Sequence, residues 1–306
     1  MGGPEGPLNV YAGGPVLRPQ RENDTMRNIF TLLLINCLLV GLQAAVTTAR
    51  ADVAQPDWRQ QKSEQVWQDK IRPAVFPDQT INTSQAAEIL TIKAPYRAED
   101  ATVVPISIHT MLPQTKQRYI RKIHVYVDRN PVPLVGVFEF TPRSGRADLA
   151  LRIRVNDQSF VRAIAEMNDG KLYMVKSFVR ATGACSAPPP PSIDESFAHM
   201  GRMKLRTVGK TVLDEPNLVQ LKIQHPNITG MQPMRIGSRV MPPPHYINMI
   251  KVDYNGKPVM RARLTFSISM DPSFRFFILP EKAGILHVTA TDTKHNTWTD
   301  DFRIST

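Results

Sequence analysis

The chain has 306 residues and a net charge of +11 at pH 7, with 42% hydrophobic residues and 26 prolines. This composition supports substantial cores and disfavours a mainly helical protein. In an exported protein, this positive charge points to acidic protein partners or anionic small substrates and not to nucleic acid. Because the basic residues are scattered and not clustered in one stripe, a generally soluble basic surface is the preferred interpretation.

The N-terminal 51 residues predict an extension followed by a signal peptide. An apolar run over 29–40 follows Arg27 and precedes the small-residue site ARA at 49–51. A basic flank, a short apolar region and an A-x-A site form the order expected of a secretory leader. We therefore expect cleavage after Ala51, export to the periplasm and no stable insertion in the membrane. Met26 is a more ordinary start than the first methionine.

The chain contains only two cysteines, Cys37 and Cys185. Cleavage of the leader removes Cys37, so the exported chain cannot form an internal disulfide. A single thiol in an oxidising compartment indicates an intermolecular partner or a reactive group.

Residues 52–187 predict a first β-sandwich. A short amphipathic helix is expected over 58–71, and strand signals begin near Leu90. Alternating apolar and polar residues predict further strands at 102–108, 123–127, 135–140, 149–155, 160–167 and 171–179. The sequence NDG at 168–170 indicates a hairpin turn. Several short strands separated by turns are typical of an antiparallel sandwich.

Residues 188–200 read as a proline-rich linker, and residues 201–306 predict a second sandwich. Strands are expected at 203–208, 219–223, 247–254, 257–264, 274–279 and 285–291. Asn255-Gly256 is the strongest hairpin signal in the chain. The predicted fold is all-β, with two immunoglobulin-like antiparallel β-sandwich domains joined by the linker and a short helix at the N-terminal end.

The segment around Cys185 is the candidate functional site. The cysteine stands among small residues, with Gly183, Ala184 and Ser186 beside it and four prolines at 188–191. Glycine gives the backbone freedom and the prolines form a stiff spacer. These features predict a thin, mobile strip, an arm, that exposes the thiol.

Motifs in both halves resemble a known pair of proteins. The motifs FTPRSG (140–145), RIRV (152–155) and AEMNDG (165–170) resemble SoxY, the sulfur-carrying subunit of the periplasmic thiosulfate-oxidising system. In the second half, HPNITG (225–230), PHYI (244–247), NGK (255–257) and SIS (267–269) resemble its partner SoxZ. The chain is similar to the fused SoxYZ-like carriers associated with quinoprotein dehydrogenases in methylotrophic bacteria.

The resemblance implies a carrier protein and not an enzyme. It assigns Cys185 the covalent attachment of sulfur-oxidation intermediates such as those of thiosulfate, which partner enzymes and c-type cytochromes then process. Two features depart from the family. Glycines flank the family's cysteine where this chain has Ala184 and Ser186, and the family's arm ends freely whereas Cys185 is tethered on both sides.

Other interpretations compete with the carrier. The chain has no nucleophile elbow, phosphate loop, paired-cysteine metal site or HExxH motif, and we predict no cofactor and no metal. The alternative function is a non-covalent accessory module for a PQQ quinoprotein (methanol or alcohol) dehydrogenase, in which Cys185 is dispensable. Arg152, Arg154 and Arg180 would favour anionic cargo or lower the thiol pKa if they lie near the arm. A copper site would use residues Met231, Met234, Met241 and His245, and loop packing is the preferred reading of that group.

Overall fold

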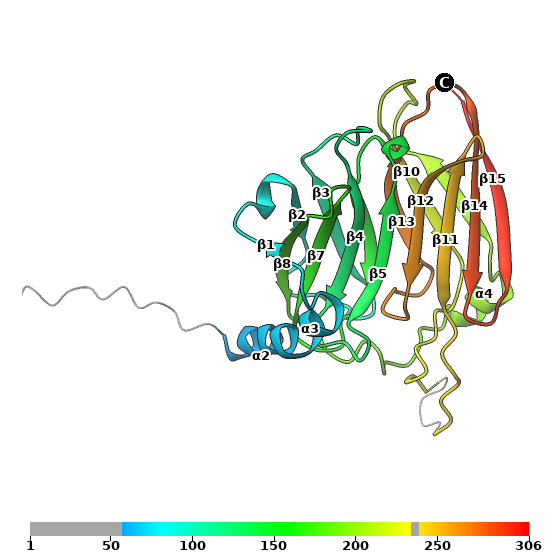
Figure 1. Cartoon of the computed structure of the whole chain (residues 1–306). Coiled ribbons are helices and arrows are strands. Elements are labelled where there is room, and N and C mark those ends of the chain that lie inside the picture. The colour runs from blue at the N-terminus through cyan, green and yellow to red at the C-terminus, as the bar shows by residue number, and fades with distance from the viewer. Residues whose placement is uncertain (1–56, 234–238, 306) are drawn as a thin grey trace, which may run out of the picture. The chain divides into compact units, whose positions relative to one another are not determined.

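The computed structural model describes residues 57–233 and 239–305. Pro56–Thr306 forms one compact unit, in which Figure 1 shows packed β-strands with short helices at their margins. The predicted signal peptide, including Cys37, lies outside the described residues. Within the described part of the chain, none of the helices has the length and apolar character that crossing a membrane requires.

A helical segment precedes the strands, as the sequence predicts. Helix α2 (Trp58–Val66) continues into a π-helical turn (Trp67–Ile71) and the short α3 (Arg72–Val75). Its first turn is capped by Asp57, which accepts a hydrogen bond from the backbone N–H of Arg59 at 3.1 Å. Against one face of the sheet, the segment buries a small cluster made of Trp67, Ile71, Phe76, Tyr126, Ile164 and Leu172.

The strands form two sheets. Across the first sheet the order is β1 (Ile81–Asn82), β8 (Leu172–Val179), β7 (Ser159–Met167), β4 (Ile120–Val127), β5 (Leu134–Phe140), β12 (Lys257–Leu264), β11 (Ile247–Tyr254), β14 (Gly284–Asp292) and β15 (Thr297–Ile304). Across the second it is β2 (Leu90–Lys93), β3 (Val104–Thr110), β6 (Leu149–Ile153), β13 (Ser273–Ile278), β10 (Asn217–Ile223) and β9 (Met203–Thr207). Only β1 pairs with its neighbour in parallel among these strands. The predicted all-β antiparallel sandwich fold is confirmed.

The two halves of the chain share both sheets. Strand β5 pairs with β12 in the first sheet, and β6 pairs with β13 in the second. In Figure 1 the green strand β5 accordingly lies beside the orange strand β12. Each half thereby satisfies the backbone N–H and C=O groups that its partner would otherwise leave open at a sheet edge.

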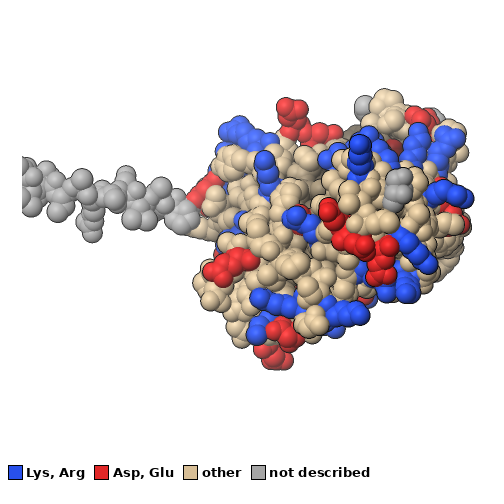
Figure 2. Space-filling model, turned by 90° about the horizontal axis from the view of Figure 1, so that it is seen from above, with Lys and Arg blue, Asp and Glu red and all other residues tan. Residues whose placement is uncertain are grey.

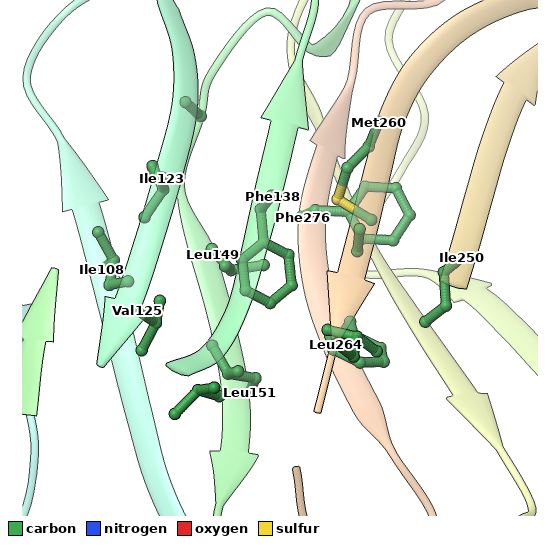
Figure 3. Close-up of a cluster of buried hydrophobic side chains, with 14 of the residues drawn as sticks. Ile108, Ile123, Val125, Phe138, Leu149, Leu151, Ile250, Met260, Leu264 and Phe276 are labelled. Atoms are coloured by element: carbon green, nitrogen blue, oxygen red, sulfur yellow. The ribbon is translucent and has the colours of Figure 1, made fainter. Parts of the chain in front are cut away.

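The core lies between the sheets. Figure 3 shows apolar side chains from both layers pointing toward one another. From the first sheet come Ile123, Val125, Phe138, Ile250, Met260 and Leu264, and from the second come Ile108, Leu149, Leu151 and Phe276. The alternating residues that predicted the strands supply this interior, because successive side chains of a strand point to opposite faces.

Some elements differ from the sequence-based expectation. Helix α4 (Ile193–Ala198) lies within the predicted linker, and edge strand β15 was not predicted, because its side chains are mostly polar. The Asn255-Gly256 turn does join β11 to β12, with φ of +48° and +74° at its two residues. Figure 2 shows basic and acidic side chains mixed over one face of the molecule, in keeping with the scattered charge of the sequence.

Candidate functional site

The arm begins where β8 ends at Val179. Gly183 has a φ of +83° and its N–H donates a hydrogen bond to the carbonyl of Asn156 at 2.8 Å. The N–H of Ala187 donates back to the carbonyl of Gly183 at 2.9 Å and closes a turn around Cys185. The expected free-standing strip is therefore a hydrogen-bonded turn held against the sandwich.

The cysteine at the centre of this turn is buried. Cys185 is 1% exposed and Ala184 is fully buried, whereas Gly183 and Ser186 are exposed. The expectation of an exposed thiol is wrong for this conformation. Because the side chain of Ala184 is small, the turn can pack closely against the rest of the protein with Cys185 facing inward.

Four side chains dock the arm, and we call their hydrogen bonds the docking contacts. Asn156 Oδ1 accepts from the N–H of Cys185 at 3.1 Å, and Arg154 Nη1 donates to the carbonyl of Ala184 at 3.3 Å. From the second half of the chain, Thr229 Oγ1 donates to the carbonyl of Cys185 at 2.6 Å. Gln232 Nε2 donates to the carbonyl of residue 187 at 3.0 Å. Both halves therefore hold the arm.

The environment makes the thiol unreactive while it is docked. Burial raises the pKa of Cys185 to about 11, and the positive charge of Arg154 opposes this only in part. At neutral pH such a thiol holds about one thiolate in ten thousand molecules. Since the thiolate is the nucleophile, chemistry at Cys185 requires the arm to leave its docked position.

The three arginines singled out by the sequence have different surroundings. Arg154 is 3% exposed and lies beside the arm, where burial lowers its pKa while the thiol of Cys185 and the carboxyl of Asp100 oppose the shift. Arg152 lines a neighbouring cavity. Arg180 instead donates to Gln158 Oε1 at 3.2 Å. Arg154 therefore donates to the arm and Arg152 lines the cavity that the arm borders, whereas the side chain of Arg180 is held by Gln158.

A second cluster of polar groups lies in the second half of the chain. His225, His245 and Asp292 are buried, and their potential metal-ligand atoms all lie within 4.8 Å of one another. His245 Nε2 lies 2.6 Å and His225 Nε2 lies 3.5 Å from Asp292 Oδ2. Burial alone would raise the pKa of Asp292, but hydrogen bonds from Asn296, His245 and backbone N–H groups lower it to about 2.

The hydrogen bonds show how this cluster is protonated. The backbone N–H of Asn227 donates to His225 Nδ1 at 3.1 Å, so the neutral ring carries its proton on Nε2, facing Asp292. That nitrogen then has no lone pair for a metal. The cluster is thus arranged as a buried carboxylate that accepts two histidine N–H groups, and a metal would need a different tautomer of His225.

His225 makes the stability of the fold depend on pH. Burial, followed by the charge of His245, lowers the pKa of His225 to about 4 from 6.5. Between these values the unfolded chain binds a proton that the folded chain does not, so stability is fully present above pH 6.5 and falls toward pH 4. The expected loss is about 1.4 kcal/mol per pH unit, up to about 3 kcal/mol in all.

The variant His225→Gln tests this origin. Its free energy of unfolding should start lower at pH 7 but fall less steeply between pH 6.5 and pH 4, by about 1.4 kcal/mol per unit. Urea denaturation at a series of pH values measures both slopes. Identical slopes would assign the acid sensitivity to other groups.

Two residues of the copper reading differ in their exposure to solvent. Met241 is 55% exposed, whereas His245 is buried against Asp292. Met234 lies outside the described residues.

Comparisons with known proteins match the two halves separately. Residues 73–185 match the model of the family described as sulfur oxidation protein SoxY, and residues 205–303 match that of sulphur oxidation protein SoxZ. The chain is a SoxY–SoxZ fusion. The match to SoxY ends at Cys185. No curated protein matches the chain.

Solved structures overlap with parts of the fusion. The sulfur carrier protein SoxY from Chlorobium limicola f thiosulfatophilum is 26% identical, covers 41% of this chain and 100% of its own, and has a TM-score of 0.33. A superoxide reductase (neelaredoxin) from Ignicoccus hospitalis is 17% identical, covers 33% of this chain and 94% of its own, and has a TM-score of 0.29. TM-scores of this size carry no argument about function.

Sequence reasoning missed most of the docking contacts. Thr229 belongs to the HPNITG motif that resembles SoxZ, and Asn156 directly follows the RIRV motif that resembles SoxY. The two motifs lie at or next to these residues, but neither motif indicates that the residue forms a hydrogen bond to the arm. That partnership depends on how the SoxY and SoxZ domains of the fusion meet.

Proposed function

We propose that the fusion is a periplasmic carrier that holds sulfur-oxidation intermediates covalently on Cys185 and presents them to partner enzymes. The observation that carries this proposal is the tandem match to SoxY and SoxZ, with the SoxY match extending to Cys185. The sulfur-oxidation families support a carrier role, and the cysteine is the one free thiol of the described residues.

The attachment step follows from thiol chemistry. When the sulfur of Cys185 joins the outer sulfur of thiosulfate, one S–S bond forms, the thiol proton leaves and two electrons pass to an acceptor. A c-type cytochrome partner would take those electrons one at a time. The protein supplies the thiol and the acceptor supplies the oxidising power, so the carrier itself needs no cofactor.

The docked conformation then acts as the resting state of the carrier. Its high thiol pKa and 1% exposure protect Cys185 from unwanted oxidation in an oxidising compartment. The docking contacts are hydrogen bonds to backbone carbonyls and one N–H, and none of the four is an ion pair. The arm would move between a protected and a presented state by breaking these hydrogen bonds.

Intact mass measures whether Cys185 carries cargo. We expect protein purified from periplasm after growth with thiosulfate to show a mass increase of a sulfur adduct, which a reductant removes. Cys185→Ser should show no increase, and Ser186→Ala should show it as wild type does. A thiol that stays unmodified under every growth condition would reject the carrier and leave the non-covalent accessory module of a quinoprotein dehydrogenase as the better account.

A further inference from the structure

A cavity of about 340 Å³ lies beside the docked arm, between the SoxY and the SoxZ domain. The arm contributes part of its wall through Ala187 and the prolines that follow. The other walls come from the SoxY strand β6 with its flanking loop and from the SoxZ domain. The polar residues that line it are Asp100, Thr102, Arg152, Arg154, Gln232 and Asp271. This volume suits a small ligand.

Two guanidinium groups in this lining have unused hydrogen-bond donors. Arg154 donates hydrogen bonds from Nη1 and Nη2 to the carbonyls of Ala184 and Asn227. Arg152 donates one from Nη2 to the carbonyl of Asp271. The Nε atoms of both arginines are buried and have no partner. A buried donor without an acceptor is unfavourable, so these atoms call for a ligand that accepts hydrogen bonds.

Neither arginine forms a direct ion pair within the described residues. In the part of the chain that the structure describes, no carboxylate forms an ion pair with either guanidinium. They are two residues apart, at the end of β6 and just beyond it, which places their side chains on the same face. Each planar guanidinium presents a fork of N–H donors that fits the oxygens of a sulfate, phosphate or carboxylate.

We propose that this cavity is a binding site for a tetrahedral sulfur oxyanion, held by the guanidinium groups of Arg152 and Arg154. The oxyanion is either free sulfate or thiosulfate from solution or the sulfonate end of a group attached to Cys185. The second source rests on the proposed carrier function, whereas the first does not. Arg154 connects the cavity with the cysteine, because it also donates to the carbonyl of Ala184, the residue before Cys185.

The acidic residues of the lining limit the strength of this site. Asp271 Oδ1 accepts hydrogen bonds from Ser196 Oγ and from the backbone N–H of His225, and Asp100 Oδ1 accepts from Thr102. These carboxylates balance the charge of the two arginines. Binding therefore depends on directed hydrogen bonds more than on long-range attraction, which suits a site that must release its ligand.

Calorimetric titration of the Cys185→Ser protein tests the free oxyanion, because this variant cannot form an adduct. We expect sulfate and thiosulfate to bind and chloride to give no saturable heat. Arg152→Gln in the same background should weaken binding about tenfold or more, since it removes a charge-assisted donor. Arg152 is the better position to vary because it is only half-buried, whereas Arg154 supports the fold as well.

Arg275→Gln provides the matched control. It removes the same charge from β13, the strand that pairs with β6, but Arg275 does not line this cavity. It should leave the affinity within about twofold, since surface charges act weakly in physiological salt. Equal weakening by both substitutions would overturn the proposal, because it would show a general charge effect. Unchanged melting temperatures confirm that both variants are folded.

A second experiment tests the adduct as the source. Wild-type protein, Arg152→Gln and Arg275→Gln are loaded with tetrathionate, whose central S–S bond the Cys185 thiolate cleaves to form the S-thiosulfonate adduct and release thiosulfate. The rate at which dithiothreitol removes the adduct is then followed by mass. Faster removal from Arg152→Gln than from Arg275→Gln supports the site with the adduct as its ligand. Sulfate binding without any adduct formation would support the site and reject the carrier. The proposal is overturned if free oxyanions do not bind and adduct removal is also unchanged.

Discussion

The variant Thr229→Val should react with a small aromatic disulfide reagent through Cys185 about 5- to 150-fold faster than wild type at pH 7. The substitution keeps the side-chain volume but removes the 2.6 Å hydrogen bond from Thr229 Oγ1 to the carbonyl of Cys185. A buried carbonyl that loses its donor costs about 1–3 kcal/mol, which corresponds to this range in the docking equilibrium. The population of the undocked arm increases by the same factor. The reaction rate increases with it, because only the undocked thiol reacts.

Thr289→Val is the control for this measurement. Its hydroxyl lies 3.4 Å from His287 Nε2 on β14 and takes no part in docking, so its thiol should react at the wild-type rate. The rates are measured by absorbance at a temperature well below unfolding for all three proteins. Equal rates in Thr229→Val and wild type would show that this contact does not hold the arm. A wild-type rate equal to that in urea would show that Cys185 is not buried in solution.

Arg162→Met should lower the free energy of unfolding by about 3–5 kcal/mol at pH 7. Arg162 and Asp128 are both fully inaccessible, and Arg162 Nε donates to the two carboxylate oxygens at 2.8 and 3.0 Å. Its guanidinium also lies 4.6 Å from the ring centre of Trp67 and donates to Glu64 at 2.8 Å. These contacts fasten the N-terminal helix to the sheet. Without the arginine, the carboxylate of Asp128 remains buried and unpaired.

Two comparisons separate the lost charge pair from lost packing. The double variant Arg162→Met with Asp128→Asn should recover part of the loss, because it removes the stranded charge. Burial already raises the pKa of Asp128, so the deficit of the single variant should also be smaller at pH 5 than at pH 7. Arg121→Met removes a more exposed ion pair with Glu166 and should cost no more than about 1 kcal/mol. A double variant as unstable as the single one would attribute the loss to packing.

The strands were predictable because their signals are local. Alternation over 149–155 and 247–254 reports which face of a strand is buried, and the Asn-Gly turn at 255–256 reports how two strands are joined. The same rules fail for β15, whose exposed edge position leaves little alternation to read. They also fail for the joining of the halves, since the pairing of β5 with β12 connects residues far apart in the chain.

For the candidate site, the sequence by itself singled out the residue that we propose carries the chemistry. A single thiol among small residues, followed by prolines and preceded by SoxY-like motifs, indicated Cys185 without any coordinates. Only the tertiary structure decided that this thiol is buried, that the guanidinium of Arg154 and not that of Arg180 donates to the carbonyl of Ala184, and that Thr229 and Asn156 hold the arm. Thr229 is separated from Cys185 by 44 residues and reaches it because the SoxY and SoxZ domains share both sheets, whereas Asn156 lies 29 residues away in the SoxY domain itself.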